Sequence, residues 1–272
     1  MSEPLLLRTE TGGVLEIVLN RPAKLNAINR EMWEGIRDAI EDFRSRHELR
    51  VMLFRANGKY FSAGSDLTDY DGDFEDSPMR ARNWMRRDLS AGMHRMFVEM
   101  ERIEKPFVVA HHAMCIGGSL ELSLSCDFRL AAKSASYAFP EGKFGVLPAS
   151  NGVSRLTRIV GTHWARYLIM ANLPVAAEKA LIMGLVHEVW PDETFEEEVM
   201  RFCRHLAQQN AEQMGAAKLA IEMARDVGLA HGRNIERMAN SALMLNPDYR
   251  AGVEKYIQGI GGKGQSKDKG ST

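Results

Sequence analysis

Short apolar stretches alternate with longer amphipathic stretches along the first two-thirds of the chain. Val14–Leu19 and Arg50–Ala56 consist mostly of apolar residues, which predicts two strands, and Leu5–Thr9 predicts another. Across Asn29–Arg46 apolar side chains recur every three or four residues, which is typical of a helix with one apolar side. These side chains are Met32, Ile36, Ile40 and Phe43. Strands that alternate with helices predict an α/β core.

The same pattern continues toward the middle of the chain and then changes. Phe107–Ala110, Asp127–Ala132 and Tyr137–Phe139 are expected to be short strands, and Asn83–Arg102 a helix. Residues 68–82 are acidic and have no clear period, which is typical of a long loop that orders over a ligand. From about residue 154 the pattern is mostly helical.

This change of pattern predicts three regions. Residues 1–195 are expected to form the α/β core, and residues 196–258 a helical C-terminal part. Residues 259–272 are rich in glycine, lysine and serine, which predicts a disordered tail.

Composition and charge exclude several classes of partner. The chain has 272 residues with 35 Lys+Arg and 36 Asp+Glu, so its net charge of −1 gives no electrostatic support for nucleic acid binding. No apolar run approaches the roughly 20 residues of a membrane span, and the N-terminus lacks the pattern of a signal peptide. The three cysteines show no CxxC spacing and indicate reduced thiols. We therefore expect a cytoplasmic protein without nucleic acid or membrane partners.

Several motifs that carry chemistry fail on inspection. The tail contains Gly-Ile-Gly-Gly-Lys-Gly at residues 259–264, but a dinucleotide fingerprint needs a strand before it and a helix after it. There is no phosphate-binding loop, serine-hydrolase elbow or H-E-x-x-H pattern. His111 and His112 are neighbours without a third ligand, and in a strand they would point to opposite faces. We expect structural or surface roles for both, and no metal site.

Three glycine-containing loops remain. They are Phe61–Leu67 (FSAGSDL), Ile116–Leu122 (IGGSLEL) and Phe139–Pro148 (FPEGKFGVLP). Each places glycines next to a carboxylate. Glycine permits backbone conformations and close approaches that other residues do not, so such loops are typical of sites where the backbone contacts a ligand.

Together with Asn20–Asn29 (NRPAKLNAIN), these loops resemble the crotonase superfamily, the enoyl-CoA hydratase/isomerase fold. The likeness runs in order from about residue 13 to residue 190 and includes Cys126–Ala132 and Ser154–Gly161. It implies a ββα spiral core of the ClpP/crotonase type with a helical C-terminal part that makes subunit contacts. It also implies a homotrimer or a homohexamer built as a dimer of trimers, with an acyl-CoA thioester as the substrate. Coenzyme A would be part of that substrate, and no other cofactor is expected.

The resemblance assigns roles to individual residues. The backbone N–H groups of Ser65 and Gly118 would hold the thioester oxygen and stabilise an enolate. Glu121 lies three residues after Gly118, and Glu141 lies 20 residues after Glu121, as in the hydratase branch. This pair would hold one water and act as base and acid. Further contacts to substrate and coenzyme A would come from Lys24, Leu25, Ala63, Gly64, Asp66, Leu67 and Gly117.

Simpler interpretations of these residues stay open. Glu121 could be an exposed surface residue and Glu141 an ordinary loop carboxylate. Asp66 could make a local cap or loop hydrogen bond instead of touching substrate. Periodicity over Ile116–Asp127 also predicts a strand, whereas the resemblance implies a helix that begins at about Gly118.

The sequence departs from the family pattern at a few positions. Ser119 stands where a third glycine is common, and His111-His112-Ala113 replaces a Val-Asn-Gly-like turn. A lysine near the C-terminus often binds coenzyme A phosphates, but Gly259 falls at that position. Ala149 lies where some isomerases and dehalogenases carry a catalytic aspartate, which argues against those branches.

The motifs favour an enoyl-CoA hydratase-type lyase that adds water to a 2-enoyl-CoA. One alternative is a double-bond isomerase that uses Glu141 alone as its proton shuttle. Residues 139–156 also look like the carnitinyl-CoA dehydratase subgroup. A non-catalytic acyl-CoA-binding relative is a further alternative, which the presence of both glutamates disfavours.

Overall fold

The computed structural model describes residues 3–69 and 93–264, and it divides the chain into two compact units, Met1–Gln209 and Asn210–Thr272. Each unit is described by itself. The division falls after Gln209 and not at residue 195, where the sequence pattern suggested it. The reason is a helix, α7 (Phe195–Ala207), whose apolar side chains are buried against the sheet of the N-terminal unit.

The N-terminal unit is built on a six-stranded sheet. Its strands, in spatial order, are β1 (Leu6–Thr11), β2 (Val14–Leu19), β3 (Val51–Ala56), β4 (Phe107–His111), β6 (Phe128–Ala132) and β9 (Glu188–Trp190). The hairpin of β1 and β2 is antiparallel, and every other neighbouring pair is parallel. The central strand β4 is buried along its whole length, as expected for a parallel strand covered on both faces.

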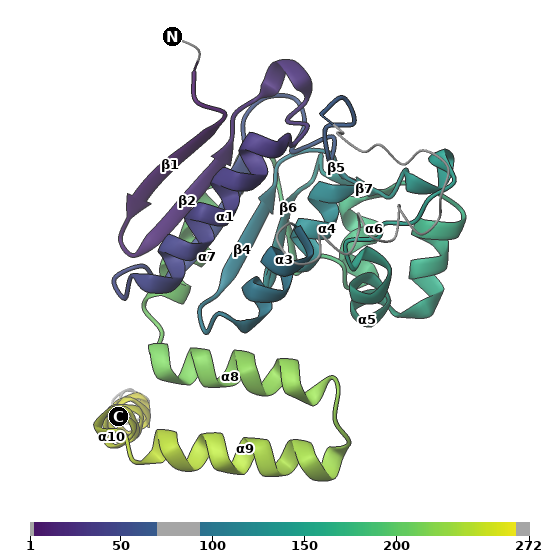
Figure 1. Cartoon of the computed structure of the whole chain (residues 1–272). Helices are drawn as coiled ribbons and strands as arrows, with labels where there is room; N and C mark the ends of the chain where they lie inside the picture. Colours follow the sequence, from purple (N-terminus) through teal and green to yellow (C-terminus); the bar gives the residue numbers. More distant parts are fainter. Residues whose placement is uncertain (1–2, 70–92, 265–272) are drawn as a thin grey trace, which may run out of the picture. The chain divides into compact units, whose positions relative to one another are not determined.

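Helices cover both faces of this sheet. The helices α1 (Arg30–Ser45) and α3 (Met93–Arg102) lie on one face and α7 on the other (Figure 1). The side chain of Asn29 caps α1 by accepting a 3.1 Å hydrogen bond from the N–H of Met32. The predicted strands and the helix α1 are confirmed, and so is the described part of the helix expected at Asn83–Arg102. The loop expected at 68–82 and the start of that helix lie largely outside the described residues.

A second, smaller sheet carries two of the three glycine loops. It consists of β5 (Cys115–Ile116), β7 (Ser136–Ala138) and β8 (Val175–Ala176), in that order. Strand β5 leads directly into the helix α4 (Gly118–Leu124), and β7 leads into the 3-10 turn η2 (Glu141–Phe144). Since β5 and β7 are parallel neighbours, the segments that follow them emerge at the same edge.

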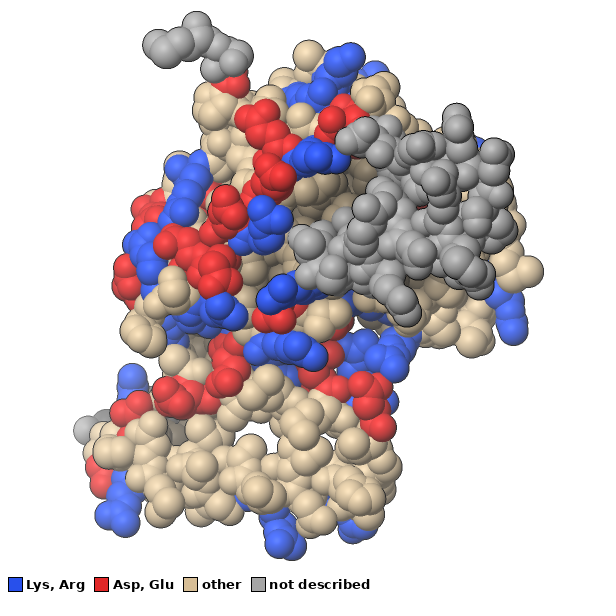
Figure 2. Space-filling view, viewed as in Figure 1, with Lys and Arg blue, Asp and Glu red and all other residues tan. Residues whose placement is uncertain are grey.

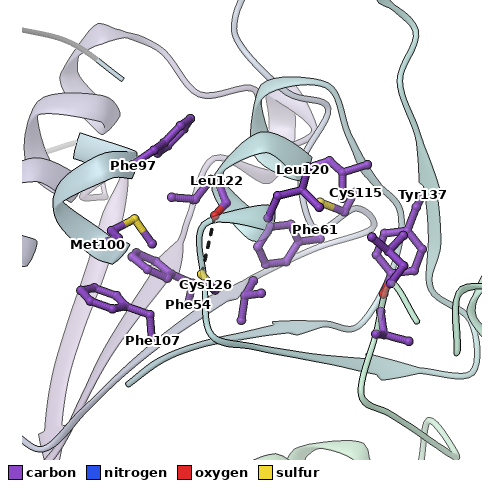
Figure 3. Packing of buried hydrophobic residues seen from close by; sticks show 14 of the residues in the cluster. Phe54, Phe61, Phe97, Met100, Phe107, Cys115, Leu120, Leu122, Cys126 and Tyr137 are labelled. Carbon is purple, nitrogen blue, oxygen red and sulfur yellow. Dashed lines mark hydrogen bonds between the residues drawn. The ribbon is translucent and has the colours of Figure 1, made fainter. Parts of the chain in front are cut away.

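The remaining elements of this unit surround that edge. They are the 3-10 turn η1 (Pro22–Lys24), α5 (Gly152–Ala165, kinked at Gly161), the π-helical turn η3 (Arg166–Met170) and α6 (Ala177–Ile182). Beneath them, Phe61, Cys115, Leu120 and Tyr137 pack into the hydrophobic core that also contains Phe54 and Phe107 (Figure 3). The core therefore reaches directly under α4.

The C-terminal unit consists of α8 (Ala211–Ala224), α9 (Leu229–Met244) and α10 (Pro247–Gly264). Asn210 caps α8 by accepting a 2.9 Å hydrogen bond from the N–H of Gln213. Helix α10 continues through Gly264, so the tail predicted from residue 259 does not begin there. Among the described residues, no helix combines the length and the apolar character that a membrane crossing requires.

Charged side chains of both signs are mixed on the face seen in Figure 2. Over β1 and α1, Arg8 pairs with Asp42, and Arg46 binds Glu10 through two hydrogen bonds of 2.7 and 2.8 Å. Such exposed pairs contribute little stability.

Candidate active site

The first glycine loop, Ser62–Asp66, is held against the segment before α1. The N–H of Ile28 donates to the carbonyl of Gly64 at 2.8 Å, and the N–H of Asp66 donates to the carbonyl of Ile28 at 2.9 Å. Because successive backbone groups of an extended segment point to opposite sides, the N–H of Ser65 faces away from Ile28. The Ser65 nitrogen lies beside the second loop, since a side-chain carbon built on Gly118 would lie 3.4 Å from it and 2.5 Å from the Ser65 hydroxyl.

The second loop ends where α4 begins. Gly118 is the first residue of that helix, so its N–H has no partner within the helix and lies at the positive end. The two loops touch through backbone atoms. A side-chain carbon on Gly64 would lie 2.8 Å from the carbonyl oxygen of Ile116 and 3.3 Å from the Gly118 nitrogen. The contact places the backbone of Ser65 beside that of Gly118, and a shared role for their N–H groups stays a prediction.

Glu121 lies in the first turn of α4 and is only 4% exposed. Its Oε1 accepts hydrogen bonds from the N–H of Ser150 at 2.7 Å and of Gly152 at 3.2 Å. Burial raises the pKa of this carboxyl to about 7, and the charge of Glu141 raises it as well, while the two N–H donors oppose the rise. The interpretation of Glu121 as an exposed surface residue is therefore wrong.

Glu141 approaches the same place from the third loop. Its Oε1 lies 3.0 Å from the position of a side-chain carbon built on Gly117, next to the start of α4. Its Oε2 is buried and makes no hydrogen bond with the described part of the chain. Burial raises the pKa of Glu141 too. A buried oxygen without a protein partner beside a second carboxyl is typical of a group that binds a ligand or a water.

The residues predicted to contact substrate and coenzyme A lie around these loops. Lys24 is exposed, Leu25 is 39% exposed and Leu67 is 65% exposed. Ala63, Gly64 and Gly117 belong to the two loops that meet, and the N–H of Ala63 donates to the carbonyl of Leu25 at 2.9 Å. Their roles toward coenzyme A stay predictions.

Asp66 makes the local interactions that the sequence left open. It forms an ion pair with Arg21 and accepts hydrogen bonds from the hydroxyl and the N–H of Thr68. The bonds from Thr68 and the Arg21 guanidinium lower its pKa to about 2. The side chain thus anchors the first loop just after Ser65, and a contact with substrate stays a prediction.

Sequence reasoning missed what holds residues 149–152, the segment that follows the third loop. Two buried side chains hold it from below. His94 Nε2 lies 2.7 Å from the carbonyl oxygen of Ala149, and Arg155 donates to the carbonyl of Ser150 at 3.4 Å. Arg155 is fixed by a two-point ion pair with Glu101, at 2.6 and 3.0 Å. The recurring apolar positions of α3 predicted a helix there but gave no sign of these partners.

The two neighbouring histidines have structural surroundings, as expected. His111 is fully buried, with Nε2 2.9 Å from the Ser123 hydroxyl and Nδ1 3.2 Å from the Tyr137 hydroxyl. Burial lowers its pKa to about 3, so it is neutral. His112 points the other way and contacts the carbonyl of Gly58 at 2.8 Å. Among the described residues, no three His, Cys, Asp or Glu side chains gather in a possible metal-binding group.

Comparison with known proteins gives one consistent family. The family model for enoyl-CoA hydratase/isomerase matches residues 9–260. A carnitinyl-CoA dehydratase of Salmonella typhi is 35% identical over 229 residues, which cover 84% of this chain and 80% of the relative. An enoyl-CoA isomerase/hydratase of Mycosarcoma maydis is 31% identical over 270 residues, which cover 92% of this chain and 91% of the relative.

Solved structures agree with the sequence relatives. The crystal structure of an enoyl-CoA hydratase from Bacillus anthracis has a TM-score of 0.85 at 27% identity and covers 94% of this chain and 96% of that chain. An enoyl-CoA hydratase subunit from Geobacillus kaustophilus has a TM-score of 0.84 at 29% identity, covering 94% and 95% of the two chains. With its meeting glycine loops and paired glutamates, the chain has the crotonase fold and belongs to the enoyl-CoA hydratase/isomerase family.

Proposed function

We propose that this protein is an enoyl-CoA hydratase-type lyase, which adds water reversibly and syn to the double bond of a 2-enoyl-CoA thioester. The observation that carries the proposal is the carboxyl pair Glu121 and Glu141. The two groups come from different loops. Glu121 is buried and Glu141 is half-buried, and the charge of Glu141 raises the pKa of Glu121. Such a pair suits a reaction that needs a base and an acid at adjacent carbons.

In the hydration direction the pair would hold one water between its carboxyl groups. Burial and the charge of Glu141 favour the proton on Glu121 in the resting protein, so the reactive state is the one in which the proton has moved to Glu141. Glu121, then a carboxylate, takes a proton from the water while the water oxygen bonds to C3. The electrons of the double bond move toward the thioester and form an enolate. Glu141, as carboxylic acid, then gives its proton to C2. The proton that Glu121 took from the water passes to Glu141 by exchange, which restores the reactive state of the pair. Dehydration runs through the same steps in reverse with the two roles exchanged.

The enolate oxygen would be held by the N–H groups of Ser65 and Gly118. The charge that develops on this oxygen also meets the positive end of α4. Removing one donor of this kind from an enzyme typically costs roughly 3–4 kcal/mol of transition-state stabilisation. Coenzyme A is part of the substrate, and the proposed steps need no other cofactor.

Two other activities are alternatives to hydration. One observation favours the first of them, and another disfavours the second. The 35% identity to carnitinyl-CoA dehydratase supports a specialised dehydratase, which would use the same water chemistry on a different acyl group. An isomerase would move a proton with Glu141 alone. The hydrogen bonds that fix Glu121 next to Glu141 argue for a mechanism that uses both.

An assay of the purified protein with a panel of 2-enoyl-CoA thioesters tests the proposal. We expect loss of the conjugated enoyl absorbance and formation of a 3-hydroxyacyl-CoA, confirmed by mass spectrometry. Parallel reactions with 3-enoyl-CoA in deuterated water and with carnitinyl-CoA separate the alternatives. A shifted, deuterated alkene without hydroxyacyl product would indicate an isomerase. Binding of the thioesters without any turnover would indicate a non-catalytic relative.

We also propose that copies of the chain assemble through the C-terminal unit into a trimer or a hexamer. Leu229, Met238 and Leu245 are each more than three-quarters exposed, which is costly for large apolar side chains unless another surface covers them. We expect sedimentation to give the mass of three or six chains. A monomer at micromolar concentration would contradict the proposal.

A further inference from the structure

Two serines of the short helix α4 and Ser125, which follows it, are buried, and their hydroxyls differ in what they reach. The hydroxyl of Ser123 donates to the carbonyl of Ser119 at 2.8 Å, and that of Ser125 to the carbonyl of Glu121 at 3.2 Å. The Ser123 hydroxyl also lies 2.9 Å from His111 Nε2 and 3.6 Å from the Cys115 sulfur. The bond of Ser125 leads back into the helix. Ser119 is fully buried and donates to the carbonyl of Ile116 at 2.8 Å, but its oxygen also lies 3.3 Å from the carbonyl of Ser62. Ser119 therefore contacts the first glycine loop.

The carbonyl of Ser62 lies at a junction between the two loops. It also accepts the N–H of Ile116 at 3.2 Å, which pairs the loops side by side. The Ser62 hydroxyl accepts the N–H of Gly64 at 3.1 Å and donates to the carbonyl of Asn26 at 2.7 Å. A short chain of hydrogen bonds thus runs from the first turn of α4 through Ser62 to Gly64, the residue before Ser65.

The thiol of Cys115 completes the surroundings of this hydroxyl. Its sulfur lies 3.4 Å from the Ser119 oxygen, in the core below the loops (Figure 3). Burial raises the pKa of Cys115 to about 12, so the thiol keeps its proton and can donate to Ser119. Ser119 can then give its own proton to a backbone carbonyl of either loop. A glycine at position 119 would have no side chain to make these contacts.

We propose that Ser119 is a positioning residue that fixes the distance between the N–H groups of Ser65 and Gly118 by linking their two loops through its hydroxyl. The inference rests on the proposed function, because it gives those two N–H groups the task of holding an enolate oxygen. Donors of this kind act only when both lie within roughly 2.7–3.1 Å of the oxygen, so a small separation of the loops weakens them. The residue acts through the backbone and does not touch substrate.

The test uses the full chain and acetoacetyl-CoA, a β-ketoacyl thioester whose enolate absorbs in the near ultraviolet. Its ionisation when bound reports the strength of the N–H donors and needs neither water addition nor a glutamate. We expect Ser119→Ala to lower the acidity constant of the bound probe about tenfold, less than the loss of a whole donor. The dissociation constant of a saturated acyl-CoA should change less than about threefold, because ground-state binding depends weakly on these donors.

Ser125→Ala is the matched control, since it removes another buried serine hydroxyl, just after the same helix, that bonds to the carbonyl of Glu121 and not to the first loop. We expect its probe acidity constant to stay within about twofold of wild type. Ser119→Gly is a second variant that should repeat the shift of Ser119→Ala. Unchanged acidity in both Ser119 variants, or an equal shift in Ser125→Ala, would overturn the assignment to Ser119. If wild type binds the probe without promoting its ionisation, the enolate site itself is wrong, and the proposed function fails with it.

Discussion

Replacing Glu121 by glutamine is expected to lower the rate of enoyl-CoA hydration by roughly 10²- to 10⁴-fold, the usual contribution of a positioned general base. Glutamine cannot take a proton from water, but its amide oxygen can still accept the N–H groups of Ser150 and Gly152. The shape of the site is therefore kept, and KM should change little. The measurement is steady-state hydration of the best substrate of the panel by both proteins.

Two comparisons isolate the loss of the base. Glu188→Gln removes an exposed carboxylate from the edge strand β9 and should leave the rate unchanged. Acetoacetyl-CoA bound to Glu121→Gln should still ionise, because the N–H donors are intact. A hydration rate within threefold of wild type would show that Glu121 is not the base.

The same variant also tests the surroundings of Glu121 through the pH dependence of stability. The carboxyl of Glu121 has a pKa of about 7 in the folded protein, against an ordinary value of 4.5. Between these values the folded state binds more protons than the unfolded state, so stability decreases as pH rises. The wild type should lose about 3 kcal/mol of unfolding free energy between pH 4.5 and pH 8 relative to Glu121→Gln. Urea unfolding of both proteins at the two pH values measures this difference, and parallel pH profiles would contradict it.

Features of the site that lie within one short segment can be predicted from the sequence, whereas contacts between distant segments cannot. The two glycine loops and the spacing of Glu121 and Glu141 lie in short segments, so motif resemblance could predict a site from them. The contacts of His94 with Ala149 and of Arg155 with Glu101 join residues more than fifty positions apart. Periodicity identifies the helix that carries such residues but not the partners they find.

The helix α4 shows why periodicity alone can mislead. Leu120, Leu122 and Leu124 alternate with polar residues, which is typical of a half-buried strand. In the structure every residue of α4 is buried, including its serines, whose hydroxyls bond to backbone carbonyls. A helix buried on all sides needs no apolar stripe, so the period of 3.6 residues is lost. The resemblance correctly predicted the helix because it placed the glycines at its start.

The C-terminal boundary was predicted less well for a related reason. Helix α7 buries Phe195, Val199 and Cys203, and this amphipathic pattern is the same whether a helix packs on a sheet or on other helices. Only the structure shows that the partner is the sheet of the N-terminal unit. Likewise, the glycines after residue 258 predicted a disordered tail, yet α10 extends through Gly264.

Replacing Gly64 by alanine is expected to lower hydration by about 10²- to 10³-fold, as the loss of an enolate-stabilising donor does. Gly64 has a φ of +90°, and a methyl group there would lie 2.8 Å from the carbonyl oxygen of Ile116 and 3.3 Å from the Gly118 nitrogen. Both atoms belong to the backbone, so the two loops must separate to make room for the methyl group. The variant should also fail to promote ionisation of acetoacetyl-CoA, unlike Glu121→Gln.

Gly12→Ala provides the matched control for this effect. Gly12 also has a positive φ, +58°, but a methyl group there meets no atom within 4 Å. This variant should lower the unfolding free energy by only roughly 1–2 kcal/mol, which is the cost of a residue other than glycine in the left-handed region. It should leave catalysis unchanged. Gly64→Ala should lower the unfolding free energy by about 1–3 kcal/mol more than Gly12→Ala, because its methyl group is also crowded by backbone atoms. Equal stability losses with full activity in Gly64→Ala would mean that the two loops need no close contact, and the N–H groups of Ser65 and Gly118 would then not form one site.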